Sequence, residues 1–216
     1  MSAPPPGTGY YVGPADPGPG ILLLAGSWGL TRGVKDTCEQ LADLGYTVLA
    51  PDLADGQVAS SEAEAMELLA EADMNVNAAL VGSSARLLLN ITSEANDRLA
   101  TIGWSSGASW ALWMSVRMPD LIRAVVTFYG TQSIAMATSD SSYLAHFASD
   151  DDLVGDDEIA NLGLNLQLAQ RPFRFEHHEG TQHGFAETHT AQFNAQAEAV
   201  AWRQTLEFLA SEHPAN

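Results

Sequence analysis

Cysteine, lysine and long apolar runs are all scarce in this chain. Its 216 residues include one cysteine, Cys38, so no internal disulfide can form. The longest purely apolar runs, such as Ile21–Ala25, have five residues, far fewer than the ~20 that a membrane-spanning helix needs. The N-terminal residues lack the cationic start and apolar core of a signal peptide. We therefore expect a cytoplasmic protein with no membrane partner.

Basic residues are also few, since nine Lys and Arg stand against 27 Asp and Glu, giving a net charge of −18. Proteins that bind nucleic acids use basic groups to displace counterions from phosphates, and anionic membranes attract basic clusters. This composition therefore argues against both kinds of partner. The acidity favours solubility, and adaptation to a salty cytoplasm is an open alternative.

Hydrophobic residues make up 46% of the chain, which is enough to form one buried core. A Pro- and Gly-rich lead-in over residues 1–20 precedes a segment without repeats or interior linkers. We therefore predict a single domain over residues 21–216, as a monomer or a small homo-oligomer, with a short strand at Tyr10–Val12.

Buried strands and amphipathic helices are predicted to alternate along that domain. The predicted strands are rich in apolar residues, with a continuous apolar run at Ile21–Ala25, and lie at Ile21–Ala25, Tyr46–Ala50, Leu99–Gly103, Ile122–Tyr129, Tyr143–Ala148 and Phe173–His177. The predicted helices are Thr31–Gly45, Glu62–Ala72, Met74–Asn90, Ser106–Met118, Asp157–Ala169 and Thr190–Ser211. This alternation indicates an α/β fold with a mostly parallel central sheet and helices on both faces. In such sheets, reactive groups lie in the loops at the carboxyl ends of the strands.

A nucleophile motif follows the predicted strand Leu99–Gly103. Gly103-Trp104-Ser105-Ser106-Gly107 has the Gly-x-Ser-x-Gly pattern, placed between a strand and a helix as the motif requires. The tight turn would expose the Ser105 hydroxyl at the N-terminal end of the next helix, where partial positive charge favours an oxyanion. Short Gly/Ser loops also occur by chance, so the motif needs partners.

Two later loops supply those partners. Asp150, Asp151 and Asp152 follow the strand Tyr143–Ala148, and His183 lies in a polar loop after the last predicted strand. The order Ser, Asp, His along the chain is the order found in α/β-hydrolases. Chemistry alone does not choose among the three aspartates, because any of them could hydrogen-bond the imidazole.

Five segments carry a family resemblance: LLLAGSWGLTRGVKDTCEQLADLGYTVLAPDL, IGWSSGAS, HFASDDDLV, QHGF and the final AVAWRQTLEFL helix. They resemble the dienelactone hydrolase family of the α/β-hydrolase superfamily. The resemblance implies an α/β-hydrolase fold with Ser105 as nucleophile, Asp151 as acid and His183 as base. It also implies that the backbone N–H groups of Ser27 and Ser106 form an oxyanion hole.

The sequence departs from the family pattern in two respects, the nucleophile with its gating glutamate and the carboxylate-binding arginines. The usual nucleophilic cysteine is Ser105, and the glutamate that controls thiol ionisation in cysteine-containing members is replaced by Gly26. The family's carboxylate-binding arginines correspond to Glu187 and, by a less secure alignment, Glu62. We therefore expect a neutral or cationic substrate without a carboxylate beside the scissile bond. The alternative is that Glu187 faces solvent and another arginine, such as Arg86, binds an anion.

Together these features predict a serine hydrolase that cleaves an ester or lactone, with no cofactor and no metal. Trp28, Trp104 and Tyr129 flank the motif loops and are candidates for the pocket wall, with core packing as the alternative. Cys38 lies on an apolar helix stripe and is predicted to be a packing residue. Two alternatives stay open: an acyltransferase or thioesterase using the same three residues, and an inactive hydrolase fold that serves as a binding module.

Overall fold

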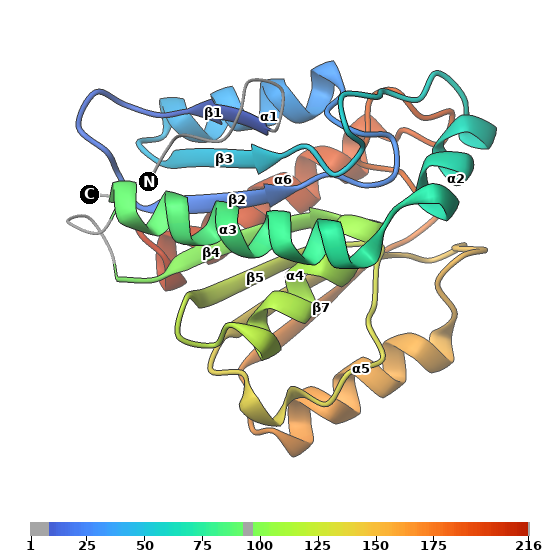
Figure 1. The fold of residues 1–216 in the computed structure, drawn as a ribbon. Coiled ribbons are helices and arrows are strands. Elements are labelled where there is room, and N and C mark those ends of the chain that lie inside the picture. The colour runs from blue at the N-terminus through green and yellow to red at the C-terminus, as the bar shows by residue number, and fades with distance from the viewer. Residues whose placement is uncertain (1–8, 93–96, 216) are drawn as a thin grey trace.

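The computed structural model describes residues 9–92 and 97–215 of the chain. In this part, seven strands form one sheet in the order β1-β3-β2-β4-β5-β6-β7 (Figure 1). The strands are β1 (Gly9–Val12), β2 (Gly20–Leu24), β3 (Thr47–Pro51), β4 (Leu99–Trp104), β5 (Ile122–Phe128), β6 (Ser142–Ala148) and β7 (Phe173–His178). Only β1 runs antiparallel to its neighbour, and the other pairs are parallel. The predicted α/β fold with a mostly parallel sheet is confirmed.

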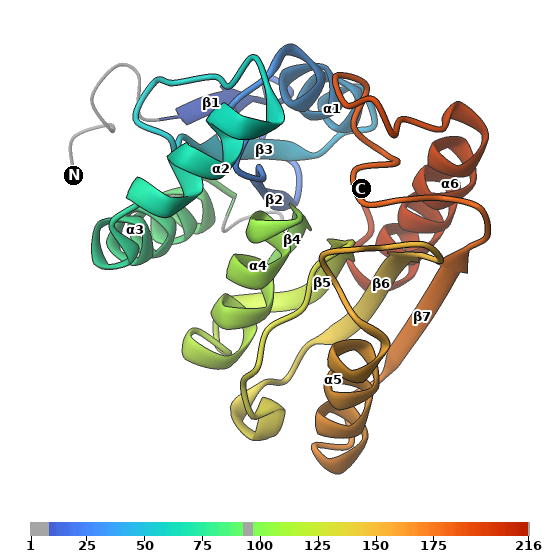
Figure 2. The same cartoon turned by 90° about the vertical axis from the view of Figure 1, so that its right-hand side faces the viewer.

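Helices cover both faces of this sheet. They are α1 (Arg32–Asp43), α2 (Glu62–Glu71), α3 (Met74–Thr92), α4 (Ser106–Arg117), α5 (Asp156–Leu168) and α6 (Ala195–Glu212), with a 3₁₀ turn η1 at Met136–Thr138. Figure 2 shows α1 and α6 on one face and α3, α4 and α5 on the other. None of the described helices combines the length and apolarity that crossing a membrane requires.

The strand β2 shows how one sequence run serves both cores. All five of its residues are buried, and successive side chains point to opposite faces of the sheet. Ile21 and Leu23 join the core under α1 and α6, whereas Leu22 and Leu24 join the core under α3 and α4. A strand covered on both faces therefore needs the unbroken apolar run that the sequence has.

Most predicted boundaries shift by one or two residues in the structure, and the start of the last helix shifts furthest. The last helix begins at Ala195 rather than Thr190, because the Asn194 side chain caps it by accepting hydrogen bonds from the next backbone N–H groups. Before Asn194 the chain makes turns, which the Thr190 hydroxyl closes by donating to the carbonyls of Gly184 and Glu187. The first helix likewise begins one residue late, with Thr31 as its N-cap.

The N-terminal segment is partly integrated into the sheet. Residues Gly9–Val12 form β1 at its edge and pair with β3, close to the predicted strand. Across the molecule, α2 and the start of α3 lie beyond the carboxyl ends of the central strands (Figure 1). This end of the sheet carries the loops in which the sequence places its reactive side chains.

Candidate active site

Ser105 occupies a strained turn between β4 and α4. Its backbone angles, φ 50° and ψ −118°, lie in a region that residues with a side chain rarely adopt. Two glycines allow the turn: a Cβ on Gly103 would lie 2.4 Å from the Gly107 carbonyl oxygen, and one on Gly107 would lie 2.0 Å from the Leu24 oxygen. The Gly-x-Ser-x-Gly spacing is therefore required by backbone contacts on both sides of the serine.

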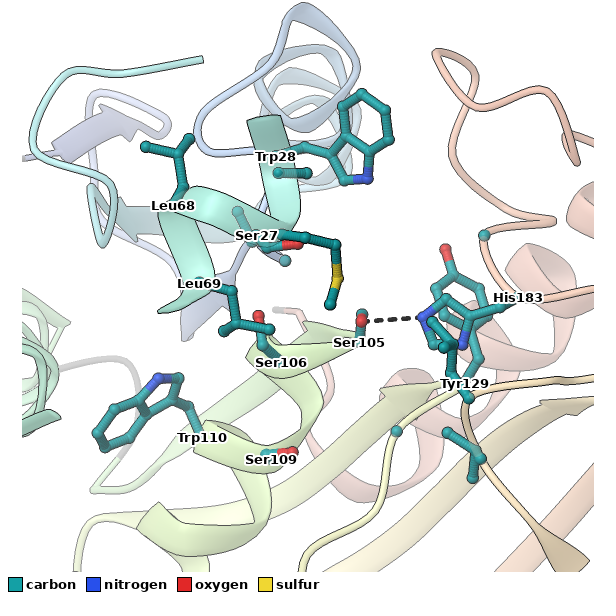
Figure 3. Close-up of a pocket in the computed structure, with 18 of the residues that line it drawn as sticks. Ser27, Trp28, Leu68, Leu69, Ser105, Ser106, Ser109, Trp110, Tyr129 and His183 are labelled. Carbon is teal, nitrogen blue, oxygen red and sulfur yellow. Dashed lines mark hydrogen bonds between the residues drawn. The ribbon is translucent and has the colours of Figure 1, made fainter. Parts of the chain in front are cut away.

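A continuous series of hydrogen bonds joins Ser105 to His183 and Asp151. The Ser105 Oγ lies 2.9 Å from His183 Nε2 (Figure 3), and His183 Nδ1 lies 3.0 and 3.1 Å from the two carboxylate oxygens of Asp151. The three side chains come from the loops after β4, β7 and β6. This arrangement can remove a proton from the serine hydroxyl and stabilise the imidazolium that forms.

The structure distinguishes among the three adjacent aspartates. The Asp151 side chain is only 3% exposed, and its Oδ1 also accepts hydrogen bonds from the backbone N–H groups of Leu153 and Val154. Asp150 and Asp152 are exposed at the rim of the cavity. Only Asp151 is therefore both held by backbone donors and bonded to the imidazole.

Backbone N–H groups of two loops lie beside Ser105. Ser27 is the second residue of a turn closed by a hydrogen bond from the Gly29 N–H to the Gly26 carbonyl. This turn approaches the nucleophile closely, since a Cβ on Gly26 would lie 3.5 Å from the Ser105 Cβ and 3.2 Å from the Trp104 oxygen. Ser106 is the first residue of α4, where the helix dipole is positive. Figure 3 shows Ser27 and Ser106 next to Ser105.

Ser105 lines a cavity of about 940 Å³. The predicted oxyanion donors Ser27 and Ser106 also line it, as do the predicted substrate-binding residues Trp28, Tyr129 and Glu187.

Trp104 is the exception. It is not among the lining residues; its side chain is buried and its ring stacks on Phe128 with the ring centroids 5.1 Å apart. The prediction of a substrate contact is wrong for Trp104, because as the last residue of β4 it points into the core of the sheet.

Glu187 is a buried carboxylate in the cavity wall, not a solvent-facing one. Its side chain is 10% exposed, and its Oε2 accepts a hydrogen bond of 2.9 Å from the Tyr129 hydroxyl. The Tyr129 ring in turn contacts His183, with centroids 4.9 Å apart. Burial raises the pKa of Glu187 to about 7, although the Tyr129 hydrogen bond and nearby His183 both lower it.

One histidine lies close to this carboxylate: His189 Nε2 is 3.8 Å from the Glu187 Oε1, and burial lowers the pKa of His189, which favours its neutral form. Residues 9–92 and 97–215 include all nine basic residues of the chain, and no arginine or lysine among them lines the cavity. Arg86 instead lies on α3, where it donates to the Gly82 carbonyl. Five carboxylates line the cavity: Glu62, Asp150, Asp152, Glu158 and Glu187.

Sequence reasoning missed the apolar wall of the cavity. The side chains of Met66, Leu68, Leu69, Trp110 and Trp113 line it from α2 and α4. The available signal is the helix Glu62–Glu71, which carries several apolar side chains. Only Ala65 of this helix is buried, so the other apolar side chains are not covered by the rest of the fold. No local sequence motif predicts such a wall, because α2 and α4 line the same cavity only in the folded chain.

Sequence reasoning also missed a buried histidine pair behind the active-site loops. His146 on β6 lies 3.1 Å from His178 Nε2 through its Nδ1 and 3.1 Å from the Thr205 hydroxyl of α6 through its Nε2. Burial lowers the pKa of His146 to about 3, so it is neutral at pH 7. In the described part of the chain, no three His, Cys, Asp or Glu side chains are grouped as metal ligands would be.

Comparisons with known proteins agree with this architecture. The sequence model of the dienelactone hydrolase family matches residues 8–213. Protein usf of Aquifex pyrophilus is 24% identical over 93% of this chain and 91% of its own. Among similar solved structures, a dienelactone hydrolase-like promiscuous phosphotriesterase from metagenomic libraries has 23% identity and a TM-score of 0.77, over 92% of this chain and 88% of its own. Thermogutta terrifontis esterase 2 phosphoramylated by tabun has 15% identity and a TM-score of 0.72, over 96% of this chain and 90% of its own.

Proposed function

The chain belongs to the dienelactone hydrolase family, and from this premise we propose that it is a serine hydrolase that cleaves an ester or lactone through an acyl-enzyme on Ser105. The observation that carries the proposal is the hydrogen-bonded series Asp151–His183–Ser105 at a strained turn. A serine is a weak nucleophile unless an adjacent base removes its proton, and His183 Nε2 lies within reach to do so.

In the proposed reaction, the Ser105 Oγ attacks the carbonyl carbon while His183 takes its proton. Asp151 holds the imidazole in one orientation and stabilises its charged form. The bond to the alcohol oxygen then breaks, and His183 returns the proton to that oxygen. Water activated by His183 hydrolyses the acyl-enzyme and restores Ser105.

The backbone N–H groups of Ser27 and Ser106 are the proposed donors to the developing oxyanion. Loss of one such donor typically costs ~10²–10³ in rate. The turn at Gly26–Gly29 supports this role because Gly26, the residue before Ser27, lies close to the nucleophile: a Cβ there would be 3.5 Å from the Ser105 Cβ. Gly26 takes the position where the family's thiol-controlling glutamate would lie, which a serine nucleophile does not need.

The substrate of this site is proposed to be neutral or cationic. Glu187 and four further carboxylates line the cavity, and no described arginine or lysine does. A substrate carboxylate at ~4 Å from one of them would be repelled by ~4 kcal/mol at an effective dielectric of 20. The net charge of −18 would also slow the approach of anions at low salt.

Covalent labelling tests the nucleophile directly. An organophosphate should add one phosphoryl group per chain, and mass mapping should place it on Ser105. Thermogutta terrifontis esterase 2, which shares the fold, has been crystallised with organophosphate adducts. Ser105→Ala should not be labelled, and its kcat/KM for a short activated ester should fall at least ~10³-fold. Its free energy of unfolding should be unchanged.

Cys38→Ala is the matched control, because burial raises the pKa of the Cys38 thiol to about 12 and the side chain packs in the core. It should label and turn over as the unmodified protein does. An active Ser105→Ala with an inactive Cys38→Ala would refute the proposed mechanism. Absence of turnover and labelling by both the unmodified protein and the control would favour a binding module.

A further inference from the structure

The cavity has two chemically different sides, separated by Ser105. In Figure 3, Leu69 and Trp110 lie on one side of Ser105, and His183 and Tyr129 lie on the other. Apolar side chains of α2 and α4 make up most of the first side, where Glu62 of α2 also lines the cavity. The second side carries the imidazole and, behind the Tyr129 ring, the buried Glu187 carboxylate. A substrate that spans Ser105 must therefore present a different chemical group to each side.

The apolar side leaves large hydrophobic side chains in contact with water. Met66, Leu69 and Met74 are 51%, 41% and 58% exposed, yet all three line the cavity. Burying such surface is favourable by roughly 25 cal/mol per Å², so an apolar group in the cavity would be held by these side chains and by the Trp110 and Trp113 rings. The wall therefore recognises a hydrocarbon group.

The reaction geometry decides which part of an ester that group is. His183 must return a proton to the departing alcohol oxygen, so the alcohol part has to lie on the His183 side of Ser105. The carbonyl oxygen faces the N–H groups of Ser27 and Ser106. The acyl part then extends away from His183, toward Leu69 and Trp110.

We propose that the space between α2 and α4 is an acyl-chain site, and that the preferred substrates are esters of medium-length hydrophobic acids with small alcohols. This inference rests on the proposed hydrolase function and names its substrate class. In the acylation step the Ser105 Oγ–carbonyl bond forms, the bond to the alcohol oxygen breaks, and the small alcohol leaves with the His183 proton. No oxidant or reductant takes part.

The size of the cavity agrees with this assignment. Its volume of about 940 Å³ lies at the upper end of the roughly 300–1,000 Å³ typical of small-molecule sites. An acetyl group would leave most of the apolar wall uncovered, whereas each further methylene covers more of it. Each buried methylene contributes ~0.8 kcal/mol, equivalent to about a fourfold gain in binding.

A chain-length series on both sides of the ester bond tests the orientation. With p-nitrophenyl acetate, butyrate, hexanoate and octanoate, kcat/KM should rise by at least tenfold from acetate to hexanoate. Ethyl hexanoate should likewise be preferred over hexyl acetate, which has the same number of carbons but carries the long chain on the alcohol. The double variant Met66→Ser/Leu69→Ser should lower the hexanoate-to-acetate ratio at least tenfold.

The matched control is Leu168→Ser, an equally polar change at a leucine of α5 that is 74% exposed and does not line the cavity. It should leave the chain-length profile unchanged. A profile that is flat, or a preference for hexyl acetate, would overturn the acyl-chain site while Ser105→Ala still abolished turnover. Turnover that survives Ser105→Ala would instead refute the underlying hydrolase mechanism, so the two failures can be told apart.

Discussion

The two sides of Ser105 are built in different ways. On the His183 side, Asp151, His183 and Tyr129 are each fixed by hydrogen bonds to buried or backbone partners. On the α2 side, the wall consists mainly of apolar side chains, which are exposed at Met66 and Leu69 and buried at Trp110. Positive φ values occur at Ser105 itself (50°) and at Tyr129 on the His183 side (38°).

This difference suggests that the His183 side carries out the proposed reaction and that the α2 side selects the substrate. Reacting groups must be held within a fraction of an ångström, which hydrogen bonds and strained turns can achieve. A hydrocarbon wall needs only shape and apolar surface, so its residues can be exchanged with little effect on the rest of the fold. Substitutions should therefore have large effects on the first side and graded effects on the second.

The largest expected effect is at the acid. Asp151→Asn keeps the shape of the side chain but removes the charge that stabilises the His183 imidazolium. We expect kcat to fall at least ~10³-fold, measured with a short activated ester, while thermal unfolding changes little. Asp150→Asn and Asp152→Asn remove the same charge from exposed neighbours and should stay within about tenfold of the unmodified protein. A strong defect in either one, with Asp151→Asn active, would reassign the acid.

A smaller but still large effect is expected on stability at the turn. Gly107→Ala places a Cβ 2.0 Å from the Leu24 oxygen, a backbone atom that cannot move away without breaking the sheet. We expect a loss of about 3 kcal/mol or more in unfolding free energy by urea denaturation.

Gly155 is the matched control for that substitution. It has a negative φ of −80°, and no atom lies within 4 Å of the position that a Cβ would take there. Gly155 is the N-cap of α5, where alanine is less favourable than glycine, and this loss offsets the gain from restricting the unfolded chain. Gly155→Ala should therefore change the unfolding free energy by less than about 1 kcal/mol. Equal losses at both positions would mean that the turn at Ser105 is not specially constrained.

Much of the fold was predictable because its signals are local. Continuous apolar runs such as Ile21–Ala25 identify strands covered on both faces, and the elbow motif specifies its own strand–turn–helix context. The order Ser105, Asp151, His183 could be proposed for the same reason. The choice of Asp151 over its neighbours came from the family resemblance, and the structure supplies its physical basis in the donors Leu153 and Val154.

Features formed by distant segments were not predictable. The side to which Trp104 points depends on the register and twist of β4 between β2 and β5, which motif spacing does not reveal. The start of α6 depends on a loop that folds back through Thr190. The apolar wall depends on α2 and α4 bordering the same cavity. The Thr205–His146–His178 contacts join three elements far apart in sequence.

The smallest expected effect concerns Glu187, the buried carboxylate on the His183 side. Its folded pKa of about 7 is higher than the unfolded value near 4.5, so the folded state binds more protons between these pH values. Its contribution to stability is therefore fully present below about pH 4.5 and is lost as the pH rises through 7. Glu187→Gln removes this loss and can still accept the Tyr129 hydrogen bond.

We therefore expect Glu187→Gln to be more stable than the unmodified protein at pH 8, by on the order of 1–3 kcal/mol, with the difference vanishing toward pH 4.5. Urea unfolding at several pH values measures it. Kinetics should change too: the ratio of kcat/KM for an anionic half-ester to that for its neutral methyl ester should rise several-fold. Glu67→Gln, an exposed glutamate of α2 that does not line the cavity, is the charge-matched control and should change neither quantity. A Glu187→Gln protein with unchanged pH dependence would show that this carboxylate is already solvated, which would remove the local reason for excluding anionic substrates.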